Sequence, residues 1–171
     1  MEAENNTIPA RTVLANPKRD TSLLIFGATS RIAAEEAAAA AGMSVDDAIA
    51  DLGASRVRVL TIGFAPGQPY LGELSAQWDL PRQTALTARV PVGALVLAVR
   101  QFTLFTAPSP TGWRHVGQTA FHCFRPGAAS PFALAPGDEM VFEPVSKPAF
   151  LRIADKATDG AGGAVIEEIA E

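Results

Sequence analysis

The part of this sequence best suited to form a site is residues 63–72, which read Gly-Phe-Ala-Pro-Gly-Gln-Pro-Tyr-Leu-Gly. Three glycines and two prolines among ten residues predict a rigid, sharply turned loop, and the loop carries the only tyrosine of the chain. Rigid loops on a scaffold are where binding and catalytic groups concentrate, and Tyr70 offers both an aromatic face and a hydroxyl. The alternative interpretation is a tight structural connection.

Residue types that usually carry catalysis are scarce. The chain has two histidines and one cysteine, and it lacks the Gly-X-Ser-X-Gly turn that presents a serine nucleophile. Cys123 lies in a predicted strand and is expected to pack in the core, whereas His115 and His122 are expected to be satisfied or surface histidines. Together they are one short of the four ligands of a structural zinc site, so no metal is expected. The sequence identifies no catalytic residue.

The charge pattern argues against nucleic acid as a partner, because the net charge is −4 and the pI is about 5.2. Two helices, predicted at residues 31–41 and 45–52, have the outline of a helix-turn-helix. The second carries three aspartates and no basic residue, so phosphates would repel it. We also expect no membrane span, because no apolar run reaches ~18 residues. The polar N-terminus and the lone cysteine predict a cytoplasmic location.

The scaffold begins with a predicted small α/β lobe over residues 1–55. An apolar run at residues 21–26 predicts a strand, and an alanine-rich stretch predicts a helix over residues 31–41. A second helix, capped by Ser44, is expected to stop at Gly53.

Residues 56–147 predict a barrel or sandwich, because Gly and Pro clusters separate many short apolar or alternating runs. We expect strands at residues 56–64, 94–99, 101–106, 113–116, 120–124 and 140–144. The run at residues 94–99 is continuously apolar, which is typical of a strand covered on both faces.

Residues 148–171 form the predicted C-terminal tail. A short helix is expected over residues 149–156, followed by a Gly-rich flexible segment at residues 159–163. The acidic residues 164–171 are expected to be helical or disordered. The predicted fold class is therefore mainly β, of the α+β kind.

Four stretches of the predicted barrel, taken together, resemble one known family. They are residues 63–72, residues 81–82 with 89–93 (RVPVG), residues 109–119 (SPTGWRHVGQT) and residues 134–142 (LAPGDEMVF). By their order and spacing over residues 29–146, the chain is identified as similar to the family of the 5-oxoprolinase B-type subunit, also called KipI or allophanate hydrolase subunit 1.

The resemblance implies a cyclophilin-like β-barrel preceded by a shortened α/β lobe. It also implies a heteromer in which a KipA-like protein, the C-type subunit, completes a shared site. A LamB/YcsF-like protein, the A-type subunit, would join them to open the lactam of 5-oxoproline with ATP. This chain would bind no cofactor tightly, although ATP would be used by the complex. The resemblance places the following residues in the substrate-binding site: Pro66, Gly67, Tyr70, Arg82, Arg89, Gln101 and Trp113.

The expected roles in this site are positioning and charge stabilisation. Tyr70 or Gln101 would position the substrate, and Arg82 or Arg89 would meet an anion with a planar guanidinium. A barrel that holds half of a site is expected to be an inactive subunit of an ATP-hydrolysing hydrolase when it is alone.

Three positions depart from the pattern of the family. Phe102 stands where a glycine is usual and is expected to fill the pocket, Thr111 also replaces a glycine, and residues 51–55 lack the usual histidine. Two alternatives therefore stay open. The first is a non-catalytic regulatory protein of the KipI type, which inhibits a histidine kinase. The second is the carboxyltransferase half of a biotin-dependent urea or amide carboxylase.

Overall fold

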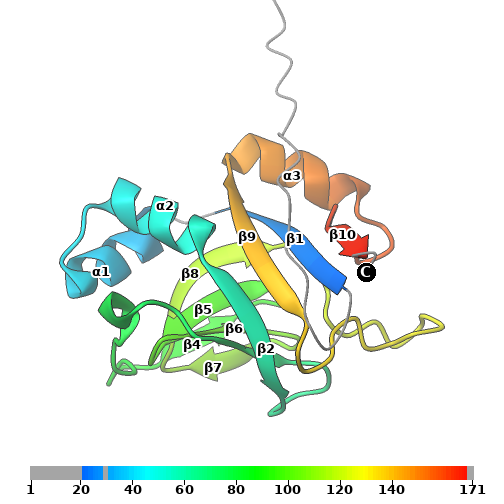
Figure 1. Cartoon of the computed structure of the whole chain (residues 1–171), viewed down its shortest axis with the longest axis horizontal. Helices are drawn as coiled ribbons and strands as arrows, with labels where there is room; N and C mark the ends of the chain where they lie inside the picture. The colour runs from blue at the N-terminus through cyan, green and yellow to red at the C-terminus, as the bar shows by residue number, and fades with distance from the viewer. Residues whose placement is uncertain (1–20, 29–30, 169–171) are drawn as a thin grey trace, which may run out of the picture.

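One curled sheet dominates the structure, a computed structural model that describes residues 21–28 and 31–168 (Figure 1). Its strands are β1 (Thr21–Ala28), β2 (Arg56–Ile62), β3 (Pro69–Gly72), β4 (Thr87–Val90), β5 (Ala94–Ala98), β6 (Gln101–Leu104), β7 (Ser109–Thr111), β8 (Arg114–Thr119), β9 (Glu139–Val145) and β10 (Val165–Glu168). Its helices are α1 (Arg31–Ala41), α2 (Val45–Ala54), α3 (Lys147–Lys156) and a short 3₁₀ helix, η1 (Ala76–Trp78). The predicted fold class, mainly β with a few helices, is confirmed.

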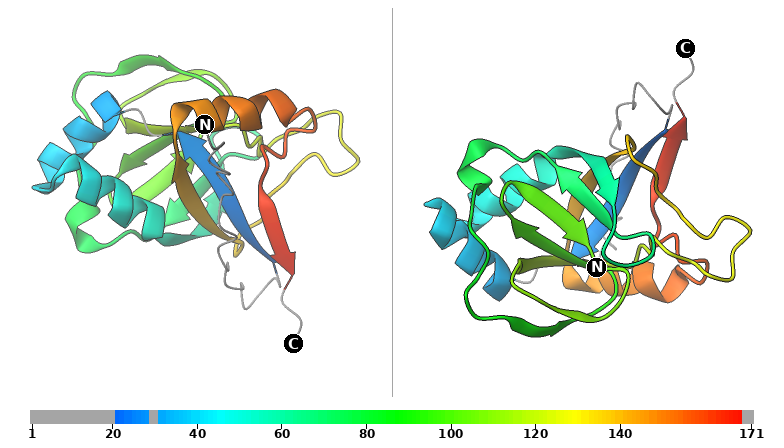
Figure 2. Two further views of the ribbon diagram at one scale, coloured as in Figure 1. Left: turned by 90° about the horizontal axis from the view of Figure 1, so that it is seen from above. Right: turned by 90° about the horizontal axis from the view of Figure 1, so that it is seen from below.

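The large sheet closes on itself. Eight strands follow the order β10-β1-β8-β5-β6-β3-β2-β9, and β1 pairs additionally with β9. This last pairing is parallel and runs for seven residue pairs, from Ser22↔Glu139 to Ala28↔Val145. Figure 2 shows β9, β1 and β10 side by side, with β10 on the outside. The β1–β9 pairing thus closes a barrel of the cyclophilin-like kind that the resemblance implies.

Strand β1 belongs to this barrel, although the sequence placed it in the N-terminal lobe. The rest of that region, α1 and α2, packs beside β8 and β9 at one end of the barrel (Figures 1 and 2). The division of the chain into residues 1–55, 56–147 and 148–171 stays a prediction. Strand pairing crosses both of its boundaries, because β1 pairs with β9 and with β10.

Local signals set the ends of the N-terminal helices. Helix α1 has the expected bounds, and Gly42 follows it with a left-handed φ of 70°. The Ser44 hydroxyl caps α2 by accepting the Asp47 N–H at 3.1 Å. Gly53 does not stop α2, which continues to Ala54. A Cβ at Gly53 would lie 2.8 Å from Cδ of Pro144, so this glycine lets α2 approach β9 closely.

The expected strands are present with shifted ends, except for the one at residues 120–124. That segment forms only a bridge between Phe124 and Phe132, and it is held instead by the C-terminal chain, where the His122 N–H donates to Gly160 O at 2.9 Å. The sequence missed β3 and also β4 and β7, which form a separate two-stranded sheet. Strand β7 contains Pro110, which a short strand at a sheet edge tolerates.

The C-terminal tail is more ordered than the sequence predicts. Helix α3 begins at Lys147, two residues before its expected start, and the Ser146 hydroxyl caps it. The Gly-rich segment, expected to be flexible, is packed: Gly162 is buried, and a Cβ there would lie 2.4 Å from the carbonyl carbon of Ala120. A helical or disordered end is wrong for β10, which pairs with β1. Residues 165–168 form a strand because they pair with the edge of β1, and this distant partner is not revealed by the local composition of the tail.

Strand β5 is buried on both faces, as its apolar run predicts. Leu95 and Leu97 point into the main core together with Phe102 of β6. The alternate residues point to the opposite face and join a second cluster, which consists of Val90, Ala94, Val96, Ala98, Phe105 and Trp113 with Tyr70 packed against it. This second cluster is the foundation of the candidate site.

Candidate functional site

A cavity of about 360 Å³ lies on the side of β6 that carries the second cluster. Four segments surround it: the loop before β3, the stretch between η1 and β4, the strand β6 with the residue after it, and the β7–β8 turn. Its lining combines aromatic and uncharged polar side chains with one cation, and comprises Phe64, Gln68, Tyr70, Arg82, Gln83, Leu86, Thr103, Phe105, Pro110, Thr111, Gly112 and Trp113.

The loop before β3 is held by its own backbone. The Gly63 N–H donates to Gln68 O at 3.0 Å, and the Gln68 N–H donates to Ala65 O at 3.1 Å. Gly67 has a φ of 69°, and a Cβ there would lie 3.1 Å from the carbonyl oxygen of Cys123. Glycine therefore suits this position in both conformation and space, and the turn fixes how the chain enters β3.

A row of side chains crosses the sheet beneath the cavity. Tyr70 of β3 pairs with Thr103 of β6, Thr103 pairs with Val96 of β5, and Val96 pairs with His115 of β8. Directly opposed residues on antiparallel strands point to the same face of the sheet. The row therefore places Thr103 beside Tyr70 on the face that carries the cavity.

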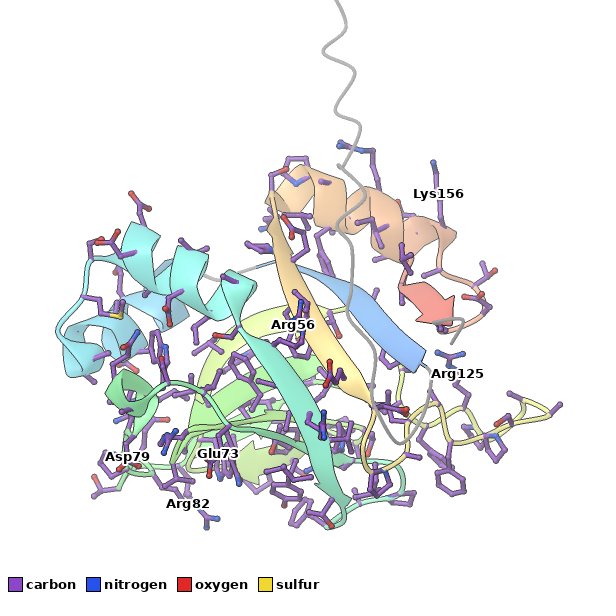
Figure 3. The ribbon with its side chains drawn as sticks, in the orientation of Figure 1. Arg56, Glu73, Asp79, Arg82, Arg125 and Lys156 are labelled. Carbon is purple, nitrogen blue, oxygen red and sulfur yellow. The ribbon has the colours of Figure 1, made fainter. Side chains whose placement is uncertain are left out.

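Aromatic rings and one guanidinium form the wall of the cavity. The Tyr70 ring meets the Trp113 ring edge-on at a centroid distance of 6.0 Å, and Cζ of Arg82 lies 5.6 Å from the Trp113 ring centroid. Figure 3 shows Arg82 at the outer edge of the molecule. Among the described residues Arg82 makes no ion pair, so its charge is available to an anionic group of a ligand.

Hydrogen bonds tie the remaining walls together. The Gln83 N–H donates to Gly112 O at 2.6 Å, which joins the stretch before β4 to the β7–β8 turn. The hydroxyl of Thr111 accepts the backbone N–H of Trp113 at 3.0 Å. Thr111, one of the departures from the family pattern, thus helps to hold the indole that forms the wall.

Three of the seven expected substrate-binding residues line the cavity together: Tyr70, Arg82 and Trp113. The other four lie outside the lining. Gly67 and the exposed Pro66 belong to the loop turn, Arg89 is exposed on β4, and Gln101 begins β6. Whether any of the seven contacts a substrate stays a prediction.

Four polar residues of the lining are missing from the expected set: Gln68, Gln83, Thr103 and Thr111, the last of which was noted only as a departure from the family pattern. Gln68 and Gln83 were within reach of sequence reasoning, because each lies close to an expected site residue in the chain. Thr103 was not, because only the strand register places it opposite Tyr70.

Phe102, which was expected to fill the pocket, does not line this cavity. Its side chain is fully buried in the main core, and its ring lies 5.5 Å from the Phe142 ring. Successive residues of a strand point to opposite faces, so Phe102 and Thr103 point apart. Phe102 therefore leaves this cavity unobstructed and instead lines an apolar hollow on the other side of the sheet, beside α1 and α2.

The segment at residues 51–55, which lacks the usual histidine, has a structural contact instead. The Asp51 carboxylate accepts the indole N–H of Trp78 at 2.6 Å, and the Trp78 side chain is fully buried. This bond ties α2 to η1. Neither residue belongs to the lining of the cavity.

Burial shifts the pKa values of His115 and Cys123, two residues whose types often act in catalysis. Burial lowers the pKa of His115, and hydrogen bonds involving Gly117 and Gln118 oppose the shift only in part. Burial raises the pKa of the Cys123 thiol to about 12, against a smaller opposing effect of Arg125. A neutral thiol that is 2% exposed is not a nucleophile, so Cys123 packs in the core as expected.

Neither a metal centre nor a membrane span is found in the part of the chain that the structure describes. Within residues 21–28 and 31–168, no three His, Cys, Asp or Glu side chains gather so that they could hold a metal ion. No helix formed by these residues is long and apolar enough to cross a membrane.

Comparisons with known proteins agree with this architecture. A protein named as the B-type subunit of 5-oxoprolinase, from Escherichia coli O157:H7, is 36% identical over 83 residues, which are 48% of this chain and 38% of that protein. The crystal structure of a conserved uncharacterized protein from Pyrococcus horikoshii has a TM-score of 0.68 at 32% identity, covering 74% of this chain and 60% of that one. Kluyveromyces lactis urea carboxylase shares the fold, with a TM-score of 0.65 at 16% identity over 87% of this chain and 16% of that chain.

A family model assigns the chain. The chain spans only 38% of the length of the Escherichia coli relative, so that likeness concerns a part of the larger protein. The model described as "Carboxyltransferase domain, subdomain C and D" matches residues 23–134, well over half of the 171 residues and all of the cavity lining. The chain therefore belongs to the carboxyltransferase-domain family of subdomains C and D, in agreement with its resemblance to the B-type subunit of 5-oxoprolinase.

Proposed function

We propose that this chain is a subunit of a heteromeric, ATP-dependent enzyme of the 5-oxoprolinase type that opens an amide or lactam. The observation that carries the proposal is the 36% identity to a protein named as the B-type subunit of 5-oxoprolinase, within a matched family. The proposal includes a KipA-like subunit that contributes the other half of the site, and a LamB/YcsF-like subunit that joins them. A cytoplasmic location stays a prediction.

The composition of the cavity supports a role in binding rather than in bond breaking. Among the described residues, those that line the cavity include no His, Cys, Asp, Glu or Lys. The hydroxyls of Tyr70, Thr103 and Thr111 are therefore the only potential acid–base or nucleophilic groups among the described residues of this lining, and it contains no His or carboxylate that would activate them. What the lining offers is aromatic surface, uncharged polar groups and the guanidinium of Arg82.

Exposed apolar side chains at the rim of the cavity support the proposal that a second protein covers it. Phe64 is 74% exposed and Leu86 is 67% exposed, and both belong to the lining. Large apolar side chains that gather at an exposed cavity are typical of a surface that a partner covers. We assign this contact to the KipA-like subunit, which would also exclude water from the ligand.

The proposed chemistry divides between the proteins of the complex. An unstrained amide is a poor electrophile, and transfer of a phosphoryl group from ATP to its oxygen would make its carbon more electrophilic. Water would then add to this carbon, the nitrogen would leave as a protonated amine as the C–N bond breaks, and a second water would hydrolyse the resulting acyl phosphate to carboxylate and phosphate. A single cation and the absence of a phosphate-binding loop from the sequence do not fit a triphosphate, so we assign ATP to another protein of the complex. This chain would orient the amide and stabilise negative charge through Arg82.

Reconstitution tests the proposal. The chain is co-expressed with the KipA-like and LamB/YcsF-like proteins of the same genome, and ATP-dependent release of glutamate from 5-oxoproline is measured. We expect turnover by the complex and none by the isolated chain. A stable complex that binds and hydrolyses no 5-oxoproline would show that this substrate is wrong.

A matched pair of variants links the activity to the cavity. Arg82→Gln removes the cation of the lining and is expected to lower kcat/KM by at least tenfold, because a charge-assisted hydrogen bond is lost. Arg152→Gln removes an exposed cation of the same type from α3 and is expected to leave the activity unchanged. Equal effects of the two changes would contradict a role for the cavity.

A second candidate is the carboxyltransferase half of a biotin-dependent urea or amide carboxylase. The description of the matching family and the shared fold with a urea carboxylase favour it. Bicarbonate-dependent carboxylation of urea that avidin abolishes would assign this activity, whereas avidin-insensitive turnover of 5-oxoproline would exclude it. Recovery of a histidine kinase bound to the chain would instead favour the regulatory alternative.

A further inference from the structure

Polar atoms at the cavity keep hydrogen-bonding capacity that the protein does not use. The Thr103 hydroxyl and Oε1 of Gln83 are buried, and neither has a hydrogen-bond partner among the described residues. Gln68 is 1% exposed and uses its Oε1 to accept the Thr106 N–H at 3.5 Å, which leaves its amide N–H groups free. Buried polar groups without a partner are uncommon in native proteins and cost free energy, so they need an explanation.

The three residues share one lining but offer different hydrogen-bonding roles. The amide N–H groups of Gln68 are donors, Oε1 of Gln83 is an acceptor, and the Thr103 hydroxyl can act as either. A ligand that satisfies all of them needs both an acceptor and a donor. A secondary amide supplies the two in one planar group, because its C=O accepts and its N–H donates.

The other residues of the lining restrict the class of ligand further. The Tyr70 and Trp113 rings offer flat, apolar contact to a small ring. Arg82 is the only charged residue among the described residues of the lining, so the complementary ligand carries a negative charge. An anion that bears a cyclic secondary amide meets all of these requirements.

We propose that Gln68, Gln83 and Thr103 determine specificity by reading the C=O and the N–H of a planar secondary amide, while Arg82 binds the anionic group of the same ligand. This inference deepens the proposed function, on which it rests for the identity of the ligand as 5-oxoproline. The reading of an amide by these three residues stands on the cavity alone.

Binding measurements on the full chain, alone and in complex with the KipA-like protein, test the proposal. Four probes separate the two parts of the ligand. They are 5-oxoproline; 2-pyrrolidinone, which lacks the carboxylate; cyclopentanecarboxylate, which lacks the amide; and cyclopentanone, which lacks both the carboxylate and the N–H. Binding is followed by calorimetry and by the change in tryptophan fluorescence, because Trp113 lines the cavity whereas Trp78, the other tryptophan, does not. We expect the wild type to bind 5-oxoproline most tightly and cyclopentanone most weakly.

The decisive variant is Thr103→Val, which removes the hydroxyl and keeps the shape of the side chain. We expect about tenfold weaker binding of 5-oxoproline and of 2-pyrrolidinone, and unchanged binding of cyclopentanecarboxylate. Thr106→Val is the matched control, because its buried hydroxyl also lacks a partner among the described residues but lies outside the lining. Gln68→Met and Gln83→Met repeat the test should Thr103→Val not fold.

The outcomes separate this inference from the proposed function. If 2-pyrrolidinone binds and is lost in Thr103→Val while 5-oxoproline is neither bound nor hydrolysed, the inference stands and the proposed substrate fails. If 5-oxoproline binds equally well to the wild type and to all three cavity variants, the inference is overturned and the proposed function remains. Failure of every amide probe to bind, to the chain or to its complex, also overturns it.

Discussion

Cys123 has a thiol whose acidity is strongly altered by its surroundings. Burial raises its pKa to about 12, so the thiol is almost entirely protonated at pH 8. We expect the native protein not to react with Ellman's reagent at pH 8, and one thiol per chain to react in guanidinium chloride. Rapid labelling of the native chain would contradict the burial of this residue.

His115 makes the stability depend on pH. Burial lowers its pKa from the ordinary 6.5, and its Nε2 has no hydrogen-bond partner among the described residues. Below pH 6.5 the unfolded chain therefore binds a proton that the folded chain takes up only at lower pH. The stability tied to the neutral imidazole is fully present above pH 6.5 and is lost as the pH falls through the folded pKa.

Urea unfolding at pH 7.5 and pH 5.5 checks this effect of His115. We expect the free energy of unfolding to be lower at pH 5.5 than at pH 7.5. This decrease should be smaller in His115→Gln, because glutamine cannot be protonated. His122→Gln is the matched control, because His122 is exposed. An unchanged pH dependence in His115→Gln would mean that the burial of this imidazole does not limit stability.

At the scale of elements, the β5–β6 hairpin turns through an unusual pair of residues. Ala98 pairs with Gln101, so the loop consists of Val99 and Arg100, with φ values of 45° and 61°. Two residues with positive φ are the mark of a type I′ turn, which favours Asn and Gly and strains a β-branched side chain. Neighbouring backbone holds the turn, because the Val99 N–H donates to Leu80 O at 2.8 Å.

Replacing the strained residue is expected to stabilise the hairpin. Val99→Asn should raise the free energy of unfolding by about 1 kcal/mol, because Asn adopts a left-handed conformation more easily. Val165→Asn is the matched control, since Val165 is 41% exposed against 43% for Val99 but lies in a regular strand, where Asn is unfavourable. Urea midpoints measure both variants, and a destabilised Val99→Asn would refute the strain.

The elements that the sequence predicts are those with local causes. Ser44 caps a helix through its own neighbour, and the continuous apolar run of β5 reports burial on both faces without reference to any partner. The apolar run at residues 21–26 predicts β1 as a strand but not its partners β9 and β10, which lie more than a hundred residues away, and β10 itself was missed. Residues 120–124 have the composition of a strand but lie against the Gly-rich tail.

The same distinction explains the candidate site. Motifs in the chain predict Tyr70, Arg82 and Trp113, which line one cavity. Thr103 joins them only through the strand register, and Phe102 turns away from the cavity because adjacent residues of β6 alternate between faces. Resemblance selects segments of a site, whereas the pairing of strands decides which side chains of those segments face the ligand.

At the scale of the whole molecule, β1 joins the two ends of the chain into one barrel. It pairs with β9 on one side and with β8 and β10 on the other. Without it, β8 and β9 would each expose an unpaired edge, and open edges promote aggregation. The cavity would be affected as well, because β8 pairs with β5, which pairs with β6 beneath the site.

Two fragments test whether the barrel needs β1. The fragment 56–147 lacks β1 and is expected to aggregate or to unfold without a cooperative transition. The fragment 21–156 lacks β10 but keeps all seven β1–β9 pairs, so it is expected to fold with lower stability than the full chain. Chemical-shift dispersion and urea unfolding measure both. Cooperative unfolding of the fragment 56–147 would contradict this requirement. It would support an independent barrel domain with those boundaries, because β1 would then only add stability to a fold that strands β2 to β9 already specify.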